Sequence, residues 1–352
     1  MGKKRIFWTI IAVLLAVISV RAVLAQSKTL SLVKLFASLR EADPVWIVLA
    51  VICMIGFIYF EGAALLCITG AIGYKRSQFS GLIYSASDIY VSAITPSATG
   101  GQPASAYVMT RDGIPAGIVT VSLLVNLIMY TLAILTIGAG TFLLDAQTFW
   151  NFKSFPSRVL IIIGLVVLTG LVAVFILLLS CGRKVFQAVA RIIRFLADHH
   201  IVRNPDKVYG RLEKTVEDYE ACVAVMRGKK RALVSAYFLN LIQRISQILV
   251  SVMVYNAFYG CSAASGKVFS AQSMATIGFN CVPIPGAIGV ADYLMIDGFK
   301  EILDREQAIH LEMISRGISF YGCMVLCGAA MLIAVIIYKH RKEEKRGDDR
   351  II

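Results

Sequence analysis

Several polar side chains of this sequence lie inside long apolar stretches, where they could bind an ion or a polar headgroup. These candidates are Glu61, Asp88, Asn126, Asn240, Gln243, Arg244, Gln247, Asp292 and Asp297. Polar groups are costly to leave unpaired in lipid, so they usually face the protein interior or a water-filled path. We therefore expect these side chains to gather around a polar site within the membrane.

Arg244 has the most definite chemistry among these residues. It shares one helical face with Gln247, three residues further on. Its planar guanidinium suits a carboxylate or a lipid phosphate. The sequence allows an ion pair with Glu61, Asp88 or Asp292, and a purely structural buried pair is the alternative to a binding role.

Two apolar stretches, 79–110 and 268–299, are interrupted near their middles by Pro and Gly. The first interruption holds Thr95, Pro96, Gly100, Gly101 and Gln102, and the second holds Pro283, Pro285, Gly286 and Gly289. Pro removes a backbone donor from a helix, and Gly admits conformations that other residues avoid. Because backbone freed in this way cannot face lipid, each stretch is predicted to be a re-entrant hairpin of two half-helices beside a wet pocket.

The two broken stretches also resemble each other. Each has Pro, then Gly, then a Tyr-x-Met that begins at Tyr107 or Tyr293. Similar broken elements of opposite orientation are typical of an inverted repeat with a binding site near the midplane; chance similarity is the alternative. Half-helix N-termini after Gly101 and Gly289 would add positive partial charge, which suits a phosphodiester.

The composition predicts the elements that must hold these groups. Of 352 residues, 58% are hydrophobic and 16% are charged, which excludes a disordered chain and a disulfide-rich secreted domain. Apolar runs of membrane-spanning length are expected at 6–25, 45–72, 114–144, 157–181, 232–257 and 315–338. We expect one all-α integral membrane domain over 1–352, with six full spans and two re-entrant hairpins. The first span is read as an uncleaved anchor, with a signal peptide as the alternative.

The net charge of +13 predicts the orientation. Most Lys and Arg residues fall on one side if both termini are cytoplasmic, as the positive-inside rule requires. The basic segment 183–231 and the tail 339–352 are then cytoplasmic in a multi-pass plasma-membrane protein. We expect 183–231 to bind anionic inner-leaflet lipids, with a solvated face as the alternative, and we expect no nucleic-acid partner.

Metal and cofactor chemistry is not expected. His199 and His200 adjoin Asp198 without a further ligand set, and no two of the eight Cys residues form a C-x-x-C pair. The sequence shows no Ser/His/Asp set, phosphate-binding loop or dinucleotide loop.

The Pro/Gly motifs give the chain a family likeness. Segments 95–103, 111–113 and 283–292 resemble the lysylphosphatidylglycerol synthase transmembrane region, also called the flippase-like family, over about 6–340. In the full-length relatives, the multiple peptide resistance factors tied to antibiotic resistance, the resemblance implies a membrane part that moves aminoacylated phosphatidylglycerol to the outer leaflet. A separate soluble domain of those relatives transfers the amino acid from tRNA. We expect that domain to be absent here, because the chain ends fourteen residues after Tyr338.

Two positions depart from the pattern of the relatives. Many of them carry an Arg shortly after the Gly-Gly pair, where this chain has Ala104, Ser105 and Ala106. Their usual Glu in the second motif is matched by Asp292, which keeps the carboxylate with a shorter reach. The first departure bears on the chemistry of the headgroup.

Three functions follow from these residues and the resemblance. The first is a phospholipid translocase without enzymatic activity. The second is a phosphatidylglycerol lysyltransferase, which would need a separate soluble synthase as partner. The third is a transporter or scaffold with another substrate, and a homo-oligomer is compatible with each. The expected substrate-contacting residues are Asp88, Thr95, Pro96, Gly100, Gly101, Gln102, Tyr107, Arg244, Pro283, Pro285, Gly286, Gly289, Asp292 and Tyr293.

Overall fold

The computed structural model describes residues 40–95, 100–180, 224, 228–282 and 284–334. The expected first span at 6–25, nearly all of 183–231 and the tail 339–352 lie outside the described residues, as do Pro96 and Pro283. Every statement below concerns the described part of the chain.

Five helices in the described residues are long and apolar enough to cross a membrane. They are Pro44–Ala71, Ala116–Leu144, Phe155–Leu177, Lys230–Tyr259 and Arg305–Ala334. Each corresponds to one of the spans that the sequence predicts. The chain is therefore an α-helical membrane protein with several spans, as expected from its composition.

The helices follow one order twice along the chain. The first set is α3 (Pro44–Ala71), α4 (Gln78–Ile94), α5 (Gly101–Arg111) and α6 (Ala116–Leu144). The second is α11 (Lys230–Tyr259), α12 (Ala263–Asn280), α13 (Val290–Phe299) and α14 (Arg305–Arg316), which continues through the π-helical segment η3 (Gly317–Gly322) to Ala334. Each set thus has a long helix, two short helices and another long helix. Between the sets lie α7 (Gln147–Asn151) and α8 (Phe155–Ser180).

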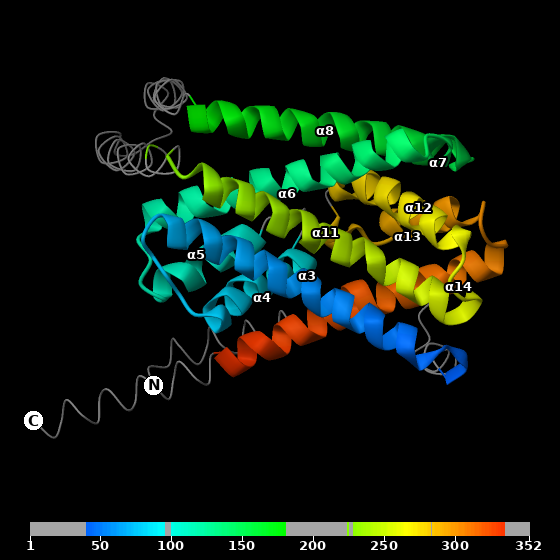
Figure 1. Ribbon diagram of the computed structural model, residues 1–352, viewed down its shortest axis with the longest axis horizontal. Helices are drawn as coiled ribbons and strands as arrows, with labels where there is room; N and C mark the ends of the chain where they lie inside the picture. The colour runs from blue at the N-terminus through cyan, green and yellow to red at the C-terminus, as the bar shows by residue number, and fades with distance from the viewer. Residues whose placement is uncertain (1–39, 96–99, 181–223, 225–227, 283, 335–352) are drawn as a thin grey trace, which may run out of the picture.

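The two sets run in opposite directions because α3 and α11 pack antiparallel along their whole length (Figure 1). At one end, the Asp43 amide donates to the Ala257 carbonyl at 2.9 Å. At the other end, the Cys67 thiol lies 3.7 Å from the Ala232 carbonyl oxygen. Since α4 follows the end of α3 and α12 follows the end of α11, the two broken stretches enter the bundle from opposite ends.

The first broken stretch is an antiparallel hairpin of α4 and α5. Helix α4 turns back along α3, where the Ser85 hydroxyl donates to the Ile58 carbonyl at 2.7 Å. The two backbones approach so closely that a Cβ on Gly62 would collide with the carbonyl oxygen of Gly81. This contact sets the depth of the hairpin against α3.

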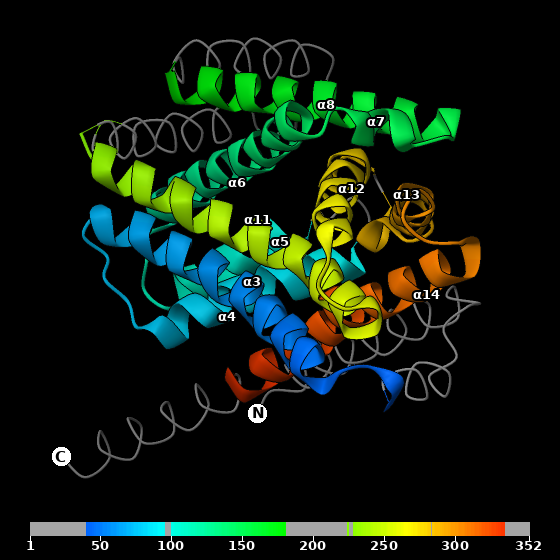
Figure 2. The ribbon, with the colours of Figure 1, turned by 45° about the vertical axis from the view of Figure 1, so that its right-hand side comes forward.

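The second broken stretch is an antiparallel hairpin of α12 and α13, which lie side by side in Figures 1 and 2. Helix α12 turns back along α11, and Ser265 donates to Asn256 at 2.6 Å while Ser251 donates to Gln272 at 3.1 Å. The short helix η2 (Pro285–Ala287) forms part of its tip and packs against α4. The tips of the two hairpins therefore meet inside the bundle.

Local sequence explains where these helices begin and break. The Asp43 carboxylate caps α3 by accepting from the Val45 amide at 2.9 Å, and Pro44 occupies the first turn. The tip after α12 contains positive φ angles at Gly286 (59°) and Gly289 (82°), which ordinary residues rarely adopt. The helix cannot continue through these two positions.

The last span begins earlier than its apolar run predicts. The sequence places it at 315–338, whereas the helix starts at Arg305, capped by Asp304 and Gln307. Its first turn carries the exposed charges of Arg305 and Glu306, whereas Glu312 and Arg316, further along the helix, are buried. Hydrophobic run length misses such a start because polar and charged residues fill the beginning of the helix.

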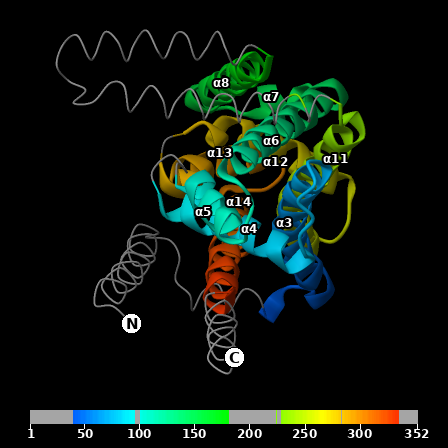
Figure 3. The same cartoon turned by 90° about the vertical axis from the view of Figure 1, so that its left-hand side faces the viewer.

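Helix α8 lies at the edge of the bundle, next to α6 (Figure 3). Only 22% of its most apolar window is buried within the protein, compared with 56% for α6. An apolar helix with so little protein contact suits a position that faces lipid.

Candidate functional site

The tip of the first hairpin is organised around the buried carboxylate of Asp88 on α4. Its Oδ1 accepts from the Ser92 hydroxyl at 3.1 Å, and its Oδ2 accepts from Nε2 of Gln102 at 2.9 Å. Gly101, the first residue of α5, lies against this carboxylate so closely that a Cβ would collide with Ser92 Oγ and Asp88 Oδ1. The tip thus brings together three of the predicted site residues.

Thr95 and Gly100 complete this tip. The Thr95 hydroxyl donates to the Val91 carbonyl at 2.7 Å and accepts from the Gly100 amide at 3.0 Å. One side chain therefore satisfies backbone groups on both sides of the break, which is what a break within a membrane requires.

Arg244 lies between α3 and α6, with 5% of its surface exposed. Its guanidinium stacks 3.7 Å above the ring centre of Tyr130 and 5.4 Å from that of Phe57. It donates to the side-chain oxygen of Gln247. The cation is thus held by aromatic faces and an amide.

Arg244 has no carboxylate in direct contact among the described residues. Glu61 and Asp88 interact with it electrostatically, but neither places an oxygen within 4.0 Å of its nitrogens. The Nε of Arg244 is buried without a hydrogen-bond partner in the described part of the chain. Of the three carboxylates that the sequence offered as partners, none forms an ion pair with it.

Two further buried polar pairs line this region. Nε2 of Gln243 donates to Glu61 at 3.1 Å, and Nδ2 of Asn240 donates to Asn126 at 3.0 Å. Each of these amides leaves its own oxygen, Gln243 Oε1 or Asn240 Oδ1, buried and without a partner in the described chain. Unsatisfied buried acceptors of this kind point to a missing donor such as water or a ligand.

The tip of the second hairpin is organised around Asp292 and Arg316. The Asp292 Oδ1 lies 2.9 Å from Nε of Arg316, and its Oδ2 accepts from the Gly289 amide at 3.0 Å. Nη2 of Arg316 also donates to the Gly286 carbonyl at 3.1 Å, and its guanidinium lies 4.7 Å from the Phe320 ring centre. Asp292 is therefore paired with Arg316 and not with Arg244.

Tyr130 connects Arg244 to the second hairpin. Its hydroxyl donates to Oδ1 of Asn280, the last residue of α12, at 3.0 Å. Since its ring also stacks on Arg244, the Tyr130 side chain contacts both the guanidinium and the end of α12.

The other predicted site residues occupy different surroundings. Tyr107 is 60% exposed on α5, where Arg111 stacks on its ring. Tyr293 is exposed on α13, and its hydroxyl contacts the Ser154 hydroxyl. Pro285 begins η2. The structure therefore gathers the Gly, Asp and Arg residues at the tips and leaves both Tyr residues outside them.

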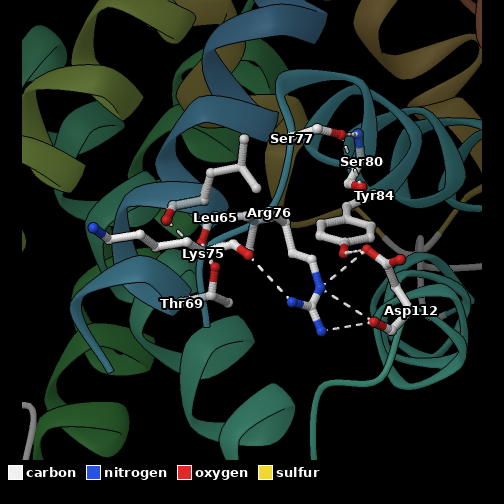
Figure 4. Close-up of polar contacts among 9 residues, drawn as sticks. Leu65, Thr69, Lys75, Arg76, Ser77, Ser80, Tyr84 and Asp112 are labelled. Atoms are coloured by element: carbon white, nitrogen blue, oxygen red, sulfur yellow. Dashed lines mark hydrogen bonds and ion pairs between the residues drawn. The ribbon is translucent and has the colours of Figure 1, made fainter. Parts of the chain in front are cut away.

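The base of the first hairpin is closed by a separate polar cluster (Figure 4). The Arg76 guanidinium donates twice to the Asp112 carbonyl, at 2.8 and 3.1 Å, and lies 3.5 Å from its carboxylate. The buried Tyr84 hydroxyl donates to the same carboxylate. The chain before α4 and the chain after α5 are thus held together.

The base of the second hairpin is tied to the loop before α8. The Lys153 ammonium lies 2.6 Å from the Glu301 carboxylate, and the Ser154 amide donates to Asp297 at 3.3 Å. The hydrogen bond and charge of Glu301 raise the pKa of Lys153, which is solvent-exposed. Both hairpins are therefore fastened at their bases by polar contacts, and the second base includes the buried carboxylate of Asp297.

Sequence reasoning missed Tyr130, Glu312 and Arg316. Glu312 and Arg316 are four residues apart and buried, so they share one face of α14. This spacing of opposite charges was visible in the sequence, but Glu312 lies before the apolar run 315–338 that marked the span, and Arg316 lies at its start. Within the described residues, no group of three His, Cys, Asp or Glu side chains is placed to hold a metal ion.

The fold defines a polytopic α-helical membrane protein with two opposed, broken-helix hairpins whose tips carry polar and charged side chains. The chain belongs to the family of the lysylphosphatidylglycerol synthase transmembrane region, whose model matches residues 9–327. It is 23% identical to the UPF0104 membrane protein MJ1595 of Methanocaldococcus jannaschii over 347 residues, which cover 95% of this chain and 97% of that protein. No solved structure matches it.

Proposed function

We propose that this protein moves a phospholipid between the two leaflets, with the headgroup passing between the hairpin tips. The observation that carries the proposal is Arg244, a buried cation with no carboxylate in direct contact in the described chain. A buried charge left without a counter-ion is costly, and a phosphate would supply one. The acyl chains would remain in lipid while the headgroup uses the polar path.

The charges around Arg244 favour a headgroup that also carries an amine. Glu61 and Asp88 flank the guanidinium and interact with it electrostatically. A phosphodiester could bind Arg244 while an ammonium group binds a carboxylate. Aminoacylated phosphatidylglycerol has both groups, and lysylphosphatidylglycerol, the lipid in the family's name, is one example.

The test is lipid movement in proteoliposomes that contain the purified chain. Fluorescent phosphatidylglycerol, its lysyl derivative and phosphatidylcholine are compared by quenching the outer leaflet. Arg244→Gln should reduce the protein-dependent rate at least tenfold, because the amide cannot neutralise a phosphate. Arg231→Gln is the matched control, since Arg231 is exposed on the same helix.

Two results would count against this proposal. Equal rates for the Arg244→Gln variant and the unmodified chain, at equal thermal stability, would remove Arg244 from the path. Formation of lysyl lipid from lysyl-tRNA by the purified chain would instead favour the transferase.

We also propose the orientation that the charge distribution predicts, with both termini cytoplasmic in the plasma membrane and 183–231 on anionic lipids of the inner leaflet. Its support is the excess of Lys and Arg in those segments. Protease protection of a C-terminal tag in sealed inside-out and right-side-out vesicles tests the placement.

A further inference from the structure

A second buried carboxyl lies beside the Asp292–Arg316 ion pair. Glu312 on α14 is 7% exposed and sits one turn before Arg316. Its carboxyl is within hydrogen-bonding reach of the Asp292 carboxyl. Two carboxyl groups can share a hydrogen bond only if one of them carries a proton.

The surroundings decide which carboxyl carries that proton. Asp292 already accepts from the Gly289 amide at 3.0 Å and lies 2.9 Å from Arg316 Nε, so one of its oxygens faces a backbone donor and the other a cation. Glu312 is more deeply buried, which favours its neutral form. Among the described residues, the charged groups that act on Glu312 are Asp292 and Arg316.

We infer that Glu312 is a proton-binding site whose occupancy controls docking of the second hairpin tip onto α14. With the proton bound, Glu312 donates to the Asp292 carboxylate, and one guanidinium balances one negative charge. With the proton released, two adjacent carboxylates face one guanidinium, and their repulsion weakens the contact that holds the tip.

The contacts of Arg316 extend this effect to the tip itself. Arg316 holds the Gly286 carbonyl, and Phe320 packs against Gly286 so closely that a Cβ there would collide with its ring. The π-helical segment η3 begins directly after Arg316, and an open pocket of about 220 Å³ adjoins it, lined in part by Met54, Ile314 and Gly317. The tip, Arg316 and this segment are thus joined by direct contacts.

The proton has a route to this site. The Asp292 side chain is 31% exposed, whereas that of Arg316 is 7% exposed. A partly exposed carboxylate within a membrane protein normally faces a water-filled space. Asp292 therefore connects that water with the surroundings of Glu312.

The inference has a consequence for lipid movement, and this part rests on the proposed function. If tip docking depends on the proton, a proton gradient can drive the lipid in one direction. One proton per lipid would allow about a tenfold leaflet ratio per pH unit of gradient.

Proton binding is tested first, without any lipid transport. Infrared difference spectra of the full chain in lipid nanodiscs are recorded between acidic and alkaline pH. The carboxylic-acid band of the unmodified chain should lose one component in Glu312→Gln and keep it in Glu306→Gln, whose side chain is exposed on the same helix. An unchanged band in Glu312→Gln overturns the assignment, because Glu312 then carries no titrating proton.

Coupling is tested second, in proteoliposomes with an imposed pH gradient. The unmodified chain and Glu306→Gln should redistribute lipid when the gradient is applied. Glu312→Gln keeps a permanent donor toward Asp292 and should lose the response to the gradient. A response equal to that of the unmodified chain would refute coupling. If neither the unmodified chain nor any variant moves lipid, the proposed function fails. The infrared result still decides whether Glu312 binds a proton.

Discussion

Gln102 donates a hydrogen bond to Asp88 across the break in the first hairpin, with 2.9 Å between Nε2 and Oδ2. The second residue of α5 is thereby fastened to the middle of α4. Because both side chains lie within the bundle, this bond holds the two half-helices at a defined depth. The position of the tip depends on side-chain chemistry as well as on the Pro and Gly residues of the break.

Two replacements of Asp88 should distinguish how much its charge and its hydrogen bonds each contribute to the stability of the protein. Asp88→Leu leaves the Gln102 and Ser92 donors unsatisfied and should destabilise the protein by about 3 kcal/mol. Asp88→Asn keeps one acceptor oxygen, and a rotated Gln102 amide can accept from it, so its cost should be smaller. Thermal unfolding in detergent compares the two variants. Equal melting temperatures for both would show that these hydrogen bonds do not stabilise the tip.

The close approach of Gly101 to α4 predicts a steric effect. A Cβ at this position would lie 2.7 Å from the Asp88 carbonyl oxygen, so Gly101→Ala should push α5 away and lower the melting temperature. Gly140→Ala on α6 is the control, because no heavy atom lies within 4 Å of its Cβ position. That variant should be neutral or gain up to about 1 kcal/mol from its better helix propensity.

The cluster at the base of the first hairpin predicts a local opening. Asp112→Ala leaves the Arg76 guanidinium and the Tyr84 hydroxyl without its carboxylate, and it should speed amide hydrogen exchange at the ends of α4 and α5. Exchange in α11 should stay unchanged. Lys75→Ala, at an exposed neighbouring position, serves as the comparison. Faster exchange throughout the chain would mean that the cluster stabilises the whole bundle rather than this hairpin.

Gly286 predicts a coupled effect between the second tip and η3. Its φ of 59° costs an L-residue about 1–2 kcal/mol, and a Cβ would also collide with the Phe320 ring. Gly286→Ala should therefore destabilise the protein by more than the backbone cost alone. Phe320→Ala in the same chain should recover part of the loss, as a double-mutant cycle would measure. Strictly additive effects would exclude a contact between these two residues in the membrane.

The spans and breaks could be read from the sequence because the signals are local. A run of apolar residues long enough to cross a bilayer predicts a helix wherever the chain folds, and the α3, α6, α8 and α11 spans agree closely with their runs. The Pro and Gly residues marked both breaks for the same reason. The likeness between the two broken stretches also led to the opposed hairpins.

The ion-pair partners of the charged side chains could not be predicted from the sequence in the same way. Arg244 had three candidate carboxylates in the sequence, and the structure gives none of them an ion pair with it, whereas Asp292 pairs with Arg316. The start of the last span was also missed, because polar and charged residues precede its apolar run.

The amino-acid order by itself determined the class of protein, the approximate spans and the two points where helices break. These follow from properties of consecutive residues in lipid. Only the tertiary structure decided which charges meet, because contacts such as Asp292–Arg316 or Tyr130–Asn280 depend on how helices distant in sequence pack together. The antiparallel packing of α3 and α11 turns two similar segments into opposed hairpins and buries Arg244 against Phe57 and Tyr130.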